Sequence, residues 1–239
     1  MDKVKKLLEN LSPSKVLDIG TGVGEFITLL KENLPSYEMI TGIDIEERVI
    51  EMARKNFDDP SINLEVMNGE SMDYEDGSFD LVCLSNSIHH LPGIKKSFNE
   101  MKRVTSNDGY ILINEMFKDN QSEEQQTHVV LHHWSAKISR MLGKVHNDTY
   151  NKAEIKEILL ENDLKVIDEI EFKYVEPNTQ ESREQLSVQV GTILDNVRDK
   201  IKDHEAYDEI CSTAEELKKR VIEVGFQGAT QYMLLCKKH

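Results

Sequence analysis

The amino-acid sequence predicts an α/β fold in which helices cover both faces of a mostly parallel sheet. Lys15–Phe26 reads K-V-L-D-I-G-T-G-V-G-E-F, a short apolar run that stops at a glycine-rich turn. Tyr37–Asp44 and Phe79–Leu84 are further runs of strand length, and stretches with helical spacing of apolar residues lie between them. Apolar runs of this kind are typical of parallel strands buried on both faces, and their alternation with helices indicates βαβ units.

The glycine-rich turn indicates a ligand site. Gly20, Gly22 and Gly24 alternate through the turn, so the backbone can adopt positive φ angles and approach a ligand without intervening Cβ atoms. The helix expected at Glu25–Asn33 would direct its N-terminal amides toward whatever lies in the turn. A purely structural turn is the alternative, and it would also imply close backbone approach.

An acidic residue indicates the kind of ligand. Asp44 ends the second strand about 20 residues after the glycine turn, where a carboxylate binds ribose hydroxyls in nucleotide-binding sheets. A solvent-exposed loop acid is the alternative. The turn is G-x-G-x-G preceded by Asp18, and no lysine follows it as in phosphate-binding loops. A cationic ligand without phosphate therefore fits this pattern best.

The rest of the chain continues the alternation, with two helical insertions. We expect helices at Asp2–Leu11, Glu46–Asn56, Lys95–Val104, Thr127–Leu142 and Tyr150–Glu161, and strands at Asn63–Met67, Tyr110–Met116, Leu164–Val175 and Ala229–Lys237. A turn is expected at Asn107–Gly109. The insertions are residues 118–150 and 177–228, and the second holds amphipathic helices at Glu181–Ile201 and Tyr207–Val224. The apolar stripes of these helices would cap the cleft, extend the core or form a dimer contact.

Four short motifs follow one another between Val16 and Phe117: D-I-G-T-G-V-G, G-I-D-I, N-G-E-S and S-F-D-L-V-C-L-S-N-S-I-H-H-L. In this order and spacing they resemble the class I S-adenosylmethionine-dependent methyltransferases, in particular the small-molecule branch similar to the ubiquinone and menaquinone C-methyltransferases. The resemblance implies a Rossmann-like fold with a seven-stranded sheet and S-adenosylmethionine as cofactor. The length favours a single domain over residues 1–239 with the two insertions. A Rossmann-like domain that binds another nucleotide, or nothing, is the alternative.

The resemblance also implies a set of cofactor-binding residues. Glu70, where the family usually has Asp, would meet the adenine amino group, while Ile45 and Met72 flank the ring. The predicted cofactor-binding residues are Asp18, Gly20, Thr21, Gly22, Gly24, Asp44, Ile45, Gly69, Glu70, Ser71, Ser85 and Asn86.

Methyl transfer places few demands on the protein's own chemistry. Holding donor and acceptor at near-attack distance supplies much of the acceleration, so no dedicated nucleophile is needed. Ligands of open parallel sheets lie outside the carboxyl ends of the strands, which brings His89 and His90 near the expected methyl group, although both could simply cap the turn that follows. The candidates for activating the acceptor are His90, Glu115, His128, His132 and Tyr150.

The first insertion contains a histidine cluster. His128 and His132 are four residues apart, on one face of the expected helix, His133 is adjacent and His146 follows a glycine-containing turn. Imidazoles in this arrangement can bind a divalent metal ion, and we predict His128, His132, His133 and His146 as its ligands. A polar helix whose histidines contact only substrate or solvent is the alternative.

Composition argues against several kinds of partner and cellular location. The net charge is −15, with 44 acidic residues against 29 basic ones, so binding to nucleic acid is disfavoured. Cys83, Cys211 and Cys236 are widely separated and indicate neither a disulfide framework nor a metal motif, which favours a reducing cytoplasm. Met1–Leu11 is charged and amphipathic, so neither a signal peptide nor a membrane span is expected there.

Sequence alone leaves the function open among three classes. Methyl transfer to an O, N, S or C atom of a small molecule is the leading hypothesis, assisted or not by a metal ion. A protein or RNA methyltransferase is less favoured, because S-N-S-I after the fourth strand lacks the Pro-Pro-aromatic signature of enzymes that modify base amino groups. A non-catalytic sensor or assembly protein that binds S-adenosylmethionine is the third class.

Overall fold

The structure of this chain is a computed structural model that describes residues 1–174 and 178–238. It divides into two compact units. Unit 1 comprises Met1–Glu115, Ala153–Phe172 and the segment from Gln231, and unit 2 comprises Met116–Lys152 and Lys173–Thr230. Unit 2 therefore collects both predicted insertions, although position 177, the expected start of the second, lies outside the described residues.

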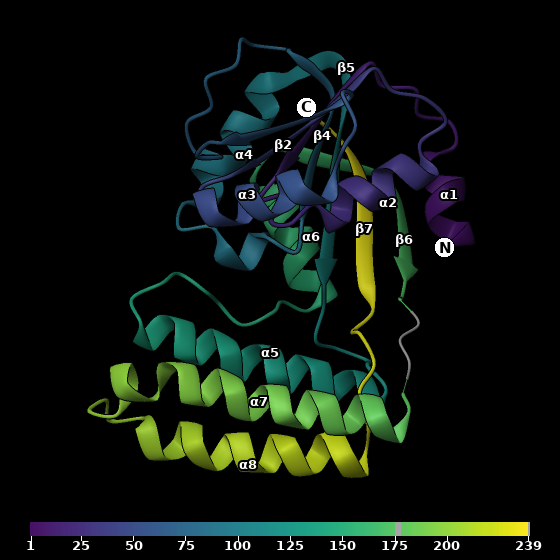
Figure 1. Ribbon diagram of the computed structural model, residues 1–239. Helices are drawn as coiled ribbons and strands as arrows, with labels where there is room; N and C mark the ends of the chain where they lie inside the picture. Colours follow the sequence, from purple (N-terminus) through teal and green to yellow (C-terminus); the bar gives the residue numbers. More distant parts are fainter. Residues whose placement is uncertain (175–177, 239) are drawn as a thin grey trace. The chain divides into compact units, whose positions relative to one another are not determined.

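Unit 1 is built on a twisted sheet of parallel strands with one antiparallel strand pair at an edge (Figure 1). The described strands are β1 (Lys15–Ile19), β2 (Met39–Asp44), β3 (Ile62–Val66), β4 (Phe79–Ser85), β5 (Thr105–Met116), β6 (Leu164–Phe172) and β7 (Gln231–Lys238). Their order in the sheet is β3-β2-β1-β4-β5-β7-β6. Strands β1 to β5 pair in parallel, and β6 pairs antiparallel with β7. The predicted mostly parallel, seven-stranded α/β sheet is thereby confirmed.

Burial on both faces explains the apolar strands. In β1, Val16 pairs with Ile40 and Leu81, and Leu17 pairs with Thr41 and Val82. Val16 and Leu17 point to opposite faces of the sheet, and both are fully buried. Because both faces of the strand are buried, apolar residues occupy consecutive positions. A strand with one face in water would instead alternate apolar and polar residues.

The helices of unit 1 cover the sheet with one apolar stripe each. They are α1 (Asp2–Leu8), α2 (Glu25–Asn33), α3 (Glu47–Asn56), α4 (Ile94–Val104) and α6 (Lys152–Glu161), with a short 3₁₀ helix, η1 (Ile88–His90). Helices α1, α2 and α3 share one buried cluster with the strands, which includes Val4, Leu8, Val16, Ile27, Leu30, Ile40, Ile50 and Cys83. The apolar stripes of α4 and α6 bury Phe98, Met101, Ile155 and Leu159.

Unit 2 consists mainly of three helices that run side by side in Figure 1: α5 (Glu123–Met141), α7 (Gln180–Ile201) and α8 (Tyr207–Glu223). Their apolar stripes form one cluster around Trp134, with Ile138, Val190, Leu194, Ile201, Ile210, Ala214 and Leu217. The Trp134 indole N–H donates a hydrogen bond to the Ile210 carbonyl at 3.0 Å, so the buried indole keeps a polar partner. The two amphipathic helices of the second insertion therefore bury their stripes against α5.

Several predicted boundaries differ from the observed ones. The turn predicted at Asn107–Gly109 is wrong, because these residues lie within β5, which begins at Thr105. The extra residues of β5 between Thr105 and Tyr110 are accommodated by a register shift opposite Phe79 and Leu81 of β4. Helix α5 begins at Glu123, earlier than expected, because Ser122 and Gln125 form a capping box. The last residue of the strand predicted at Leu164–Val175 lies outside the described residues.

Among the helices that the described residues form, none has the length and apolar character needed to cross a membrane.

Candidate functional site

The turn between β1 and α2 has the backbone conformation that its glycines predict. Gly20, Gly22 and Gly24 have φ angles of 68°, 54° and 91°. The Thr21 amide donates to the Ile43 carbonyl at 2.9 Å, which ties the turn to the end of β2. The three glycines therefore have a left-handed backbone conformation that residues with a side chain rarely adopt.

The three glycines differ in what surrounds them. A Cβ atom on Gly24 would overlap the ring of Phe57, and one on Gly20 would lie 2.6 Å from Oγ of Ser87. A Cβ atom on Gly22 would meet nothing within 4 Å. Gly20 and Gly24 thus serve packing within unit 1, whereas Gly22 presents bare backbone to open space.

Asp44 lies beside this turn, half-buried at the end of β2. Its Oδ2 atom accepts a hydrogen bond from the Gly22 amide at 3.1 Å, and its Oδ1 atom accepts one from the Glu46 amide at 2.9 Å. Each carboxylate oxygen has a second lone pair, so the side chain can still accept hydrogen bonds from ligand hydroxyls.

Asp18 is the buried acid beneath the turn. Only 1% of its surface is exposed, its Oδ2 atom accepts a hydrogen bond from the Thr21 hydroxyl at 2.7 Å, and its Oδ1 atom has no partner among the described residues. Burial raises the pKa of Asp18 to about 7, and nearby Asp44 adds to the rise while the Thr21 hydrogen bond opposes it. A buried carboxylate oxygen without a partner fits a ligand that carries a hydrogen-bond donor or a positive charge.

A second loop carries Glu70 after β3. The Asn68 side chain accepts a hydrogen bond from the Glu70 amide at 2.9 Å, and its carbonyl accepts one from the Ser71 amide at 3.0 Å. The Oε1 atom of Glu70 is buried without a partner among the described residues, and a Cβ atom on Gly93 would lie 2.8 Å from it. Because residue 93 is glycine, there is room for the Glu70 side chain, which is longer than the aspartate that the resemblance leads one to expect.

Apolar and polar side chains complete this edge of unit 1. Ile45 is 67% exposed directly after Asp44, whereas Met72 is buried. At the end of β4, the Ser85 hydroxyl accepts a hydrogen bond from the Asn114 amide group at 3.0 Å, and the Asn86 amide donates to the Asn114 carbonyl at 2.7 Å. Asn86 has a φ angle of 46°, a strained conformation of the kind found at functional sites.

Glu115 and His89 form a buried pair at the carboxyl ends of β5 and β4. The His89 Nδ1 atom lies 2.8 Å from Glu115 Oε1, and both side chains are at most 1% exposed. The second Glu115 oxygen accepts a hydrogen bond from the Ile88 amide at 3.0 Å. His90, the candidate taken from the sequence, is exposed, with its ring centroid 4.3 Å from that of His89. Two adjacent histidines give no sequence signal for which one is buried.

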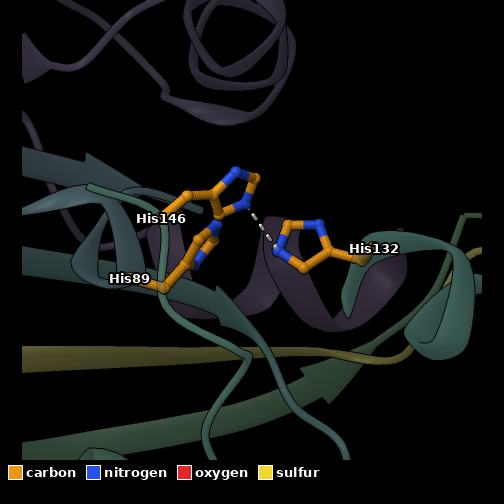
Figure 2. A group of neighbouring side chains, drawn as sticks. All are labelled: His89, His132 and His146. Carbon is orange, nitrogen blue, oxygen red and sulfur yellow. Dashed lines mark hydrogen bonds between the residues drawn. The ribbon is translucent and has the colours of Figure 1, made fainter. Parts of the chain in front are cut away.

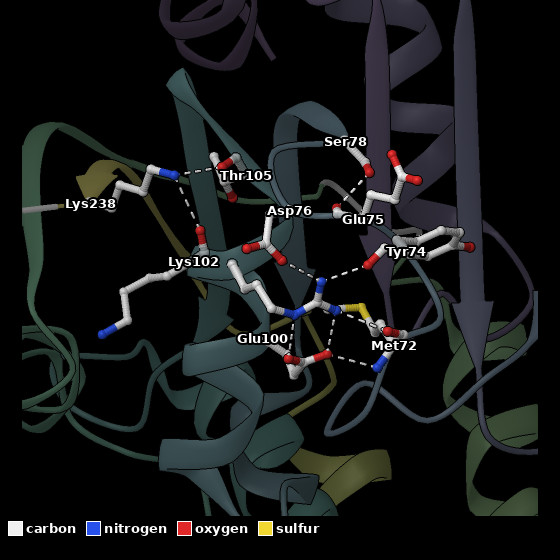
Figure 3. Close-up of polar contacts among 10 residues, drawn as sticks. Met72, Tyr74, Glu75, Asp76, Ser78, Glu100, Lys102, Thr105 and Lys238 are labelled. Carbon is white, nitrogen blue, oxygen red and sulfur yellow. Dashed lines mark hydrogen bonds and ion pairs between the residues drawn. The ribbon is translucent and has the colours of Figure 1, made fainter.

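An ion pair between Glu100 and Arg103 on α4 holds the loop that follows Glu70. Figure 3 shows Glu100 beside Met72 of this loop. Glu100 Oε2 accepts a hydrogen bond from the Met72 amide at 2.8 Å, and Arg103 donates to the Met72 carbonyl at 2.9 Å and the Tyr74 carbonyl at 2.6 Å. Arg103 also donates to Glu100 at 2.7 Å and Asp76 at 3.0 Å. Neither Glu100 nor Arg103 was identified from the sequence, where an acid and a base three residues apart on a helix suggest only an ordinary surface pair.

The histidines of unit 2 separate into different environments. His132 and His146 face each other with their Nε2 atoms 3.2 Å apart, as Figure 2 shows. His128 instead accepts a hydrogen bond from the Ala229 amide at 2.8 Å on Nδ1, and burial lowers its pKa to about 4. The Nε2 atom of His133 accepts one from the Thr149 amide at 3.2 Å.

Tyr150, the remaining catalytic candidate, precedes α6 and lies in unit 2. The Tyr150 carbonyl accepts a hydrogen bond from the Lys118 amide at 3.0 Å. The amide of Lys152, two residues later, donates to the Asp119 side chain at 3.0 Å. These contacts explain why the helix begins at Lys152 instead of Tyr150, as predicted.

The strand order, the glycine turn after β1 and the carboxylate at the end of β2 together define the class I S-adenosylmethionine-dependent methyltransferase fold. The residues present fit that cofactor. Gly22 offers bare backbone, Asp44 offers acceptors for ribose hydroxyls, and the unpartnered oxygens of Asp18 and Glu70 offer acceptors for amino groups.

Comparison with known proteins agrees with this fold. Residues 17–113 match the model of a family described as a methyltransferase domain. A ubiquinone/menaquinone biosynthesis C-methyltransferase from Citrifermentans bemidjiense is 36% identical over 114 residues, which cover 46% of this chain and 48% of that protein. A malonyl-[acyl-carrier protein] O-methyltransferase from Geobacter sulfurreducens is 31% identical over 112 residues, covering 46% of this chain and 42% of that protein. A crystal structure from Bacillus halodurans has a TM-score of 0.60 at 16% identity and covers 99% of this chain and 97% of that one, which supports the fold alone.

Residues 17–113, which are less than half of the chain, therefore match the methyltransferase domain family, and the resemblance seen in the four motifs is confirmed. The chain spans about half the length of the curated relatives it matches.

Proposed function

We propose that this protein transfers a methyl group from S-adenosylmethionine to a small-molecule acceptor and leaves S-adenosylhomocysteine. The observation that carries the proposal is the hydrogen bond between Asp44 and the Gly22 amide, which holds an acceptor of ribose hydroxyls against a bare glycine turn. The named activities of the two relatives support methyl transfer. Their acceptors differ, since one is a C-methyltransferase and the other an O-methyltransferase, so the methylated atom stays open.

The cofactor-binding residues divide the cofactor among themselves. Gly22 and the turn around it would lie along the methionine part, Asp44 would accept from the ribose hydroxyls, and Glu70 would accept from the adenine amino group. Ile45 and Met72 would provide apolar contact for the ring. The remaining proposed cofactor-binding residues are Asp18, Gly20, Thr21, Gly24, Gly69, Ser71, Ser85 and Asn86.

When bound, the cofactor supplies an electrophilic methyl group, and the chain's own residues would hold the acceptor and take its proton. Glu115 is well placed to orient His89, because a neutral imidazole that donates its Nδ1 hydrogen to a carboxylate keeps Nε2 as a proton acceptor. We infer that His89 accepts the proton of an acceptor's O–H, N–H, S–H or C–H group and that Glu115 acts by positioning His89. The other candidates for this role remain His90, His128, His132 and Tyr150.

We further infer a second cofactor, a divalent cation that polarises the acceptor, at the histidines of the first insertion. The sequence predicts His128, His132, His133 and His146 as its ligands. The contacts of His128 and His133 with backbone amides favour the pair His132 and His146 among these four.

Partner and location follow from charge, exposure and cysteine chemistry. A net charge of −15 supports a small-molecule acceptor over nucleic acid. Val188 and Ile193 on α7 are 69% and 37% exposed, which supports a homodimer contact through residues 177–228. The wide separation of Cys83, Cys211 and Cys236 in the sequence supports a cytoplasmic location.

Turnover of labelled methyl groups tests the proposal. The protein would be incubated with ¹³C-methyl S-adenosylmethionine and fractions of a metabolite extract, and carbon NMR would identify the atom that receives the label. Label in a small molecule supports the proposal. Label only in protein or RNA would favour a protein or RNA methyltransferase. Cofactor binding by a folded preparation without any transfer would favour a non-catalytic sensor or assembly protein.

A further inference from the structure

Two imidazoles in unit 2 meet nitrogen to nitrogen. His132 lies on α5, and His146 lies in the segment that joins α5 to α6. Their Nε2 atoms are 3.2 Å apart and their ring centroids 4.9 Å apart, with the rings nearly perpendicular (Figure 2). Both ring edges therefore point toward the same small volume.

This separation is close to the distance between two ligand atoms of a tetrahedral metal site. With metal-to-nitrogen bonds of about 2.0 Å, two ligand nitrogens of a tetrahedral zinc ion lie about 3.3 Å apart. Only small movements of the two rings would then be needed to place both nitrogens on one ion. We propose that His132 and His146 bind one zinc-like transition-metal ion through their Nε2 atoms.

The surroundings of His146 support ligation. Its Nδ1 atom lies 3.2 Å from the Ser139 hydroxyl, which can accept the Nδ1 hydrogen and leave a lone pair on Nε2. Its carbonyl accepts a hydrogen bond from Arg140 at 2.6 Å, and Arg140 is paired with Asp148 at 3.1 Å. A hydrogen bond to the second ring nitrogen is the usual companion of a metal-binding histidine, and the pairing of Arg140 with Asp148 reduces the repulsion that a cation would meet.

Ligand chemistry selects the metal. Imidazole nitrogen suits zinc, cobalt, nickel and copper, whereas magnesium and calcium prefer oxygen. Two histidines leave further coordination positions for water or another oxygen or nitrogen donor. The use of the ion in methyl transfer rests on the proposed function, but its binding does not.

The contact could also be a plain hydrogen bond between two neutral imidazoles, and metal titration separates the two possibilities. Untagged protein stripped with a chelator would be titrated with Co²⁺, whose visible absorption reports nitrogen ligands in a tetrahedral field, and Zn²⁺ would then be added as a competitor. We expect one equivalent of Co²⁺ to bind to the wild-type protein and Zn²⁺ to displace it.

His132→Ala and His146→Ala should each abolish the tetrahedral absorption, and Ser139→Ala should weaken binding by roughly 10-fold to 100-fold. His204→Ala is the matched control, since His204 is exposed outside the pair and should bind metal as the wild type does. Circular dichroism of every variant checks the fold. Equal Co²⁺ affinity in the wild type and the His132/His146 double variant, or no nitrogen-ligand absorption in the wild type, would overturn the proposal. S-adenosylhomocysteine titrations of the same samples report separately on the proposed function.

Discussion

Asp44 accepts a hydrogen bond from the backbone amide of Gly22 at 3.1 Å, although 22 residues separate the two. The contact joins the carboxyl end of β2 to the turn that follows β1. It fixes the direction of the carboxylate, so little conformational freedom remains to be lost when a ligand hydroxyl binds.

Asp44→Ala should weaken S-adenosylmethionine binding by at least about tenfold, since each hydrogen bond to a charged group contributes roughly 1.5–3 kcal/mol. Isothermal titration calorimetry measures the change. Asp73→Ala, at an exposed acid of the same unit, is the matched control. Unchanged affinity in a folded Asp44→Ala variant would remove Asp44 from the site.

Gly22→Ala should abolish cofactor binding while the chain still folds. Alanine at the observed φ of 54° costs about 1–2 kcal/mol of backbone strain, but its Cβ would meet nothing within 4 Å. Gly143→Ala has the same kind of strain, at a φ of 78° and also in open space, and should bind the cofactor normally. Thermal unfolding and calorimetry of both variants separate strain from steric exclusion. Similar affinities for the two variants would contradict the account of Gly22.

Asp18 should make stability and cofactor binding depend on pH in opposite directions. Its pKa is about 7 in the folded chain, above the value of about 3.9 expected when unfolded. The folded state therefore holds this proton more tightly, and stability should fall as pH rises from about 4 through about 7. A cationic ligand favours the charged carboxylate, so affinity for S-adenosylmethionine should rise over the same range.

Asp18→Asn tests this assignment. At pH 8 the variant should unfold at a higher temperature, by about 2–4 °C for each kcal/mol of removed desolvation penalty, yet bind the cofactor more weakly. A melting temperature that falls at pH 8, with an unchanged pH profile of binding, would show that Asp18 is ionised at no cost in the folded chain.

Arg103→Ala should lower cofactor affinity by about tenfold through the loop after Glu70, because Met72 and Tyr74 lose charge-assisted hydrogen bonds. Arg103→Lys should restore only part of the affinity, since lysine lacks the planar fork. Asp76→Asn is the control, because the Asp76 side chain is 83% exposed and its ion pair should contribute less than about 1 kcal/mol. Equal affinity in Arg103→Ala and wild type would exclude a positioning role.

The exposed apolar side chains of α7 predict a homodimer. Light scattering should give twice the 27.5 kDa mass of one chain, and Val188→Lys should shift the protein toward the monomer. A wild-type protein that stays monomeric at high concentration would contradict this contact.

The sequence was sufficient for the parts of the site that backbone geometry determines. Gly22 and Asp44 follow from the glycine pattern and from strand spacing, because the carboxyl ends of parallel strands meet at one edge. The partners of side chains were less accessible. Periodicity places His128 and His132 on one face of a helix, but it does not show that one contacts the Ala229 amide and the other His146. Likewise, nothing local in the sequence indicates that Glu115 pairs with His89 instead of His90.

Transfer of a labelled methyl group under single-turnover conditions tests the central claim most directly. Wild-type protein would be mixed with ¹⁴C-methyl S-adenosylmethionine and the acceptor fraction. It should convert the cofactor to S-adenosylhomocysteine and place one equivalent of label in a small molecule. At low cofactor concentration, Asp44→Ala should transfer at least about tenfold less label. No labelled small molecule from a wild-type preparation that binds the cofactor, or equal transfer by wild type and Asp44→Ala, would contradict the account.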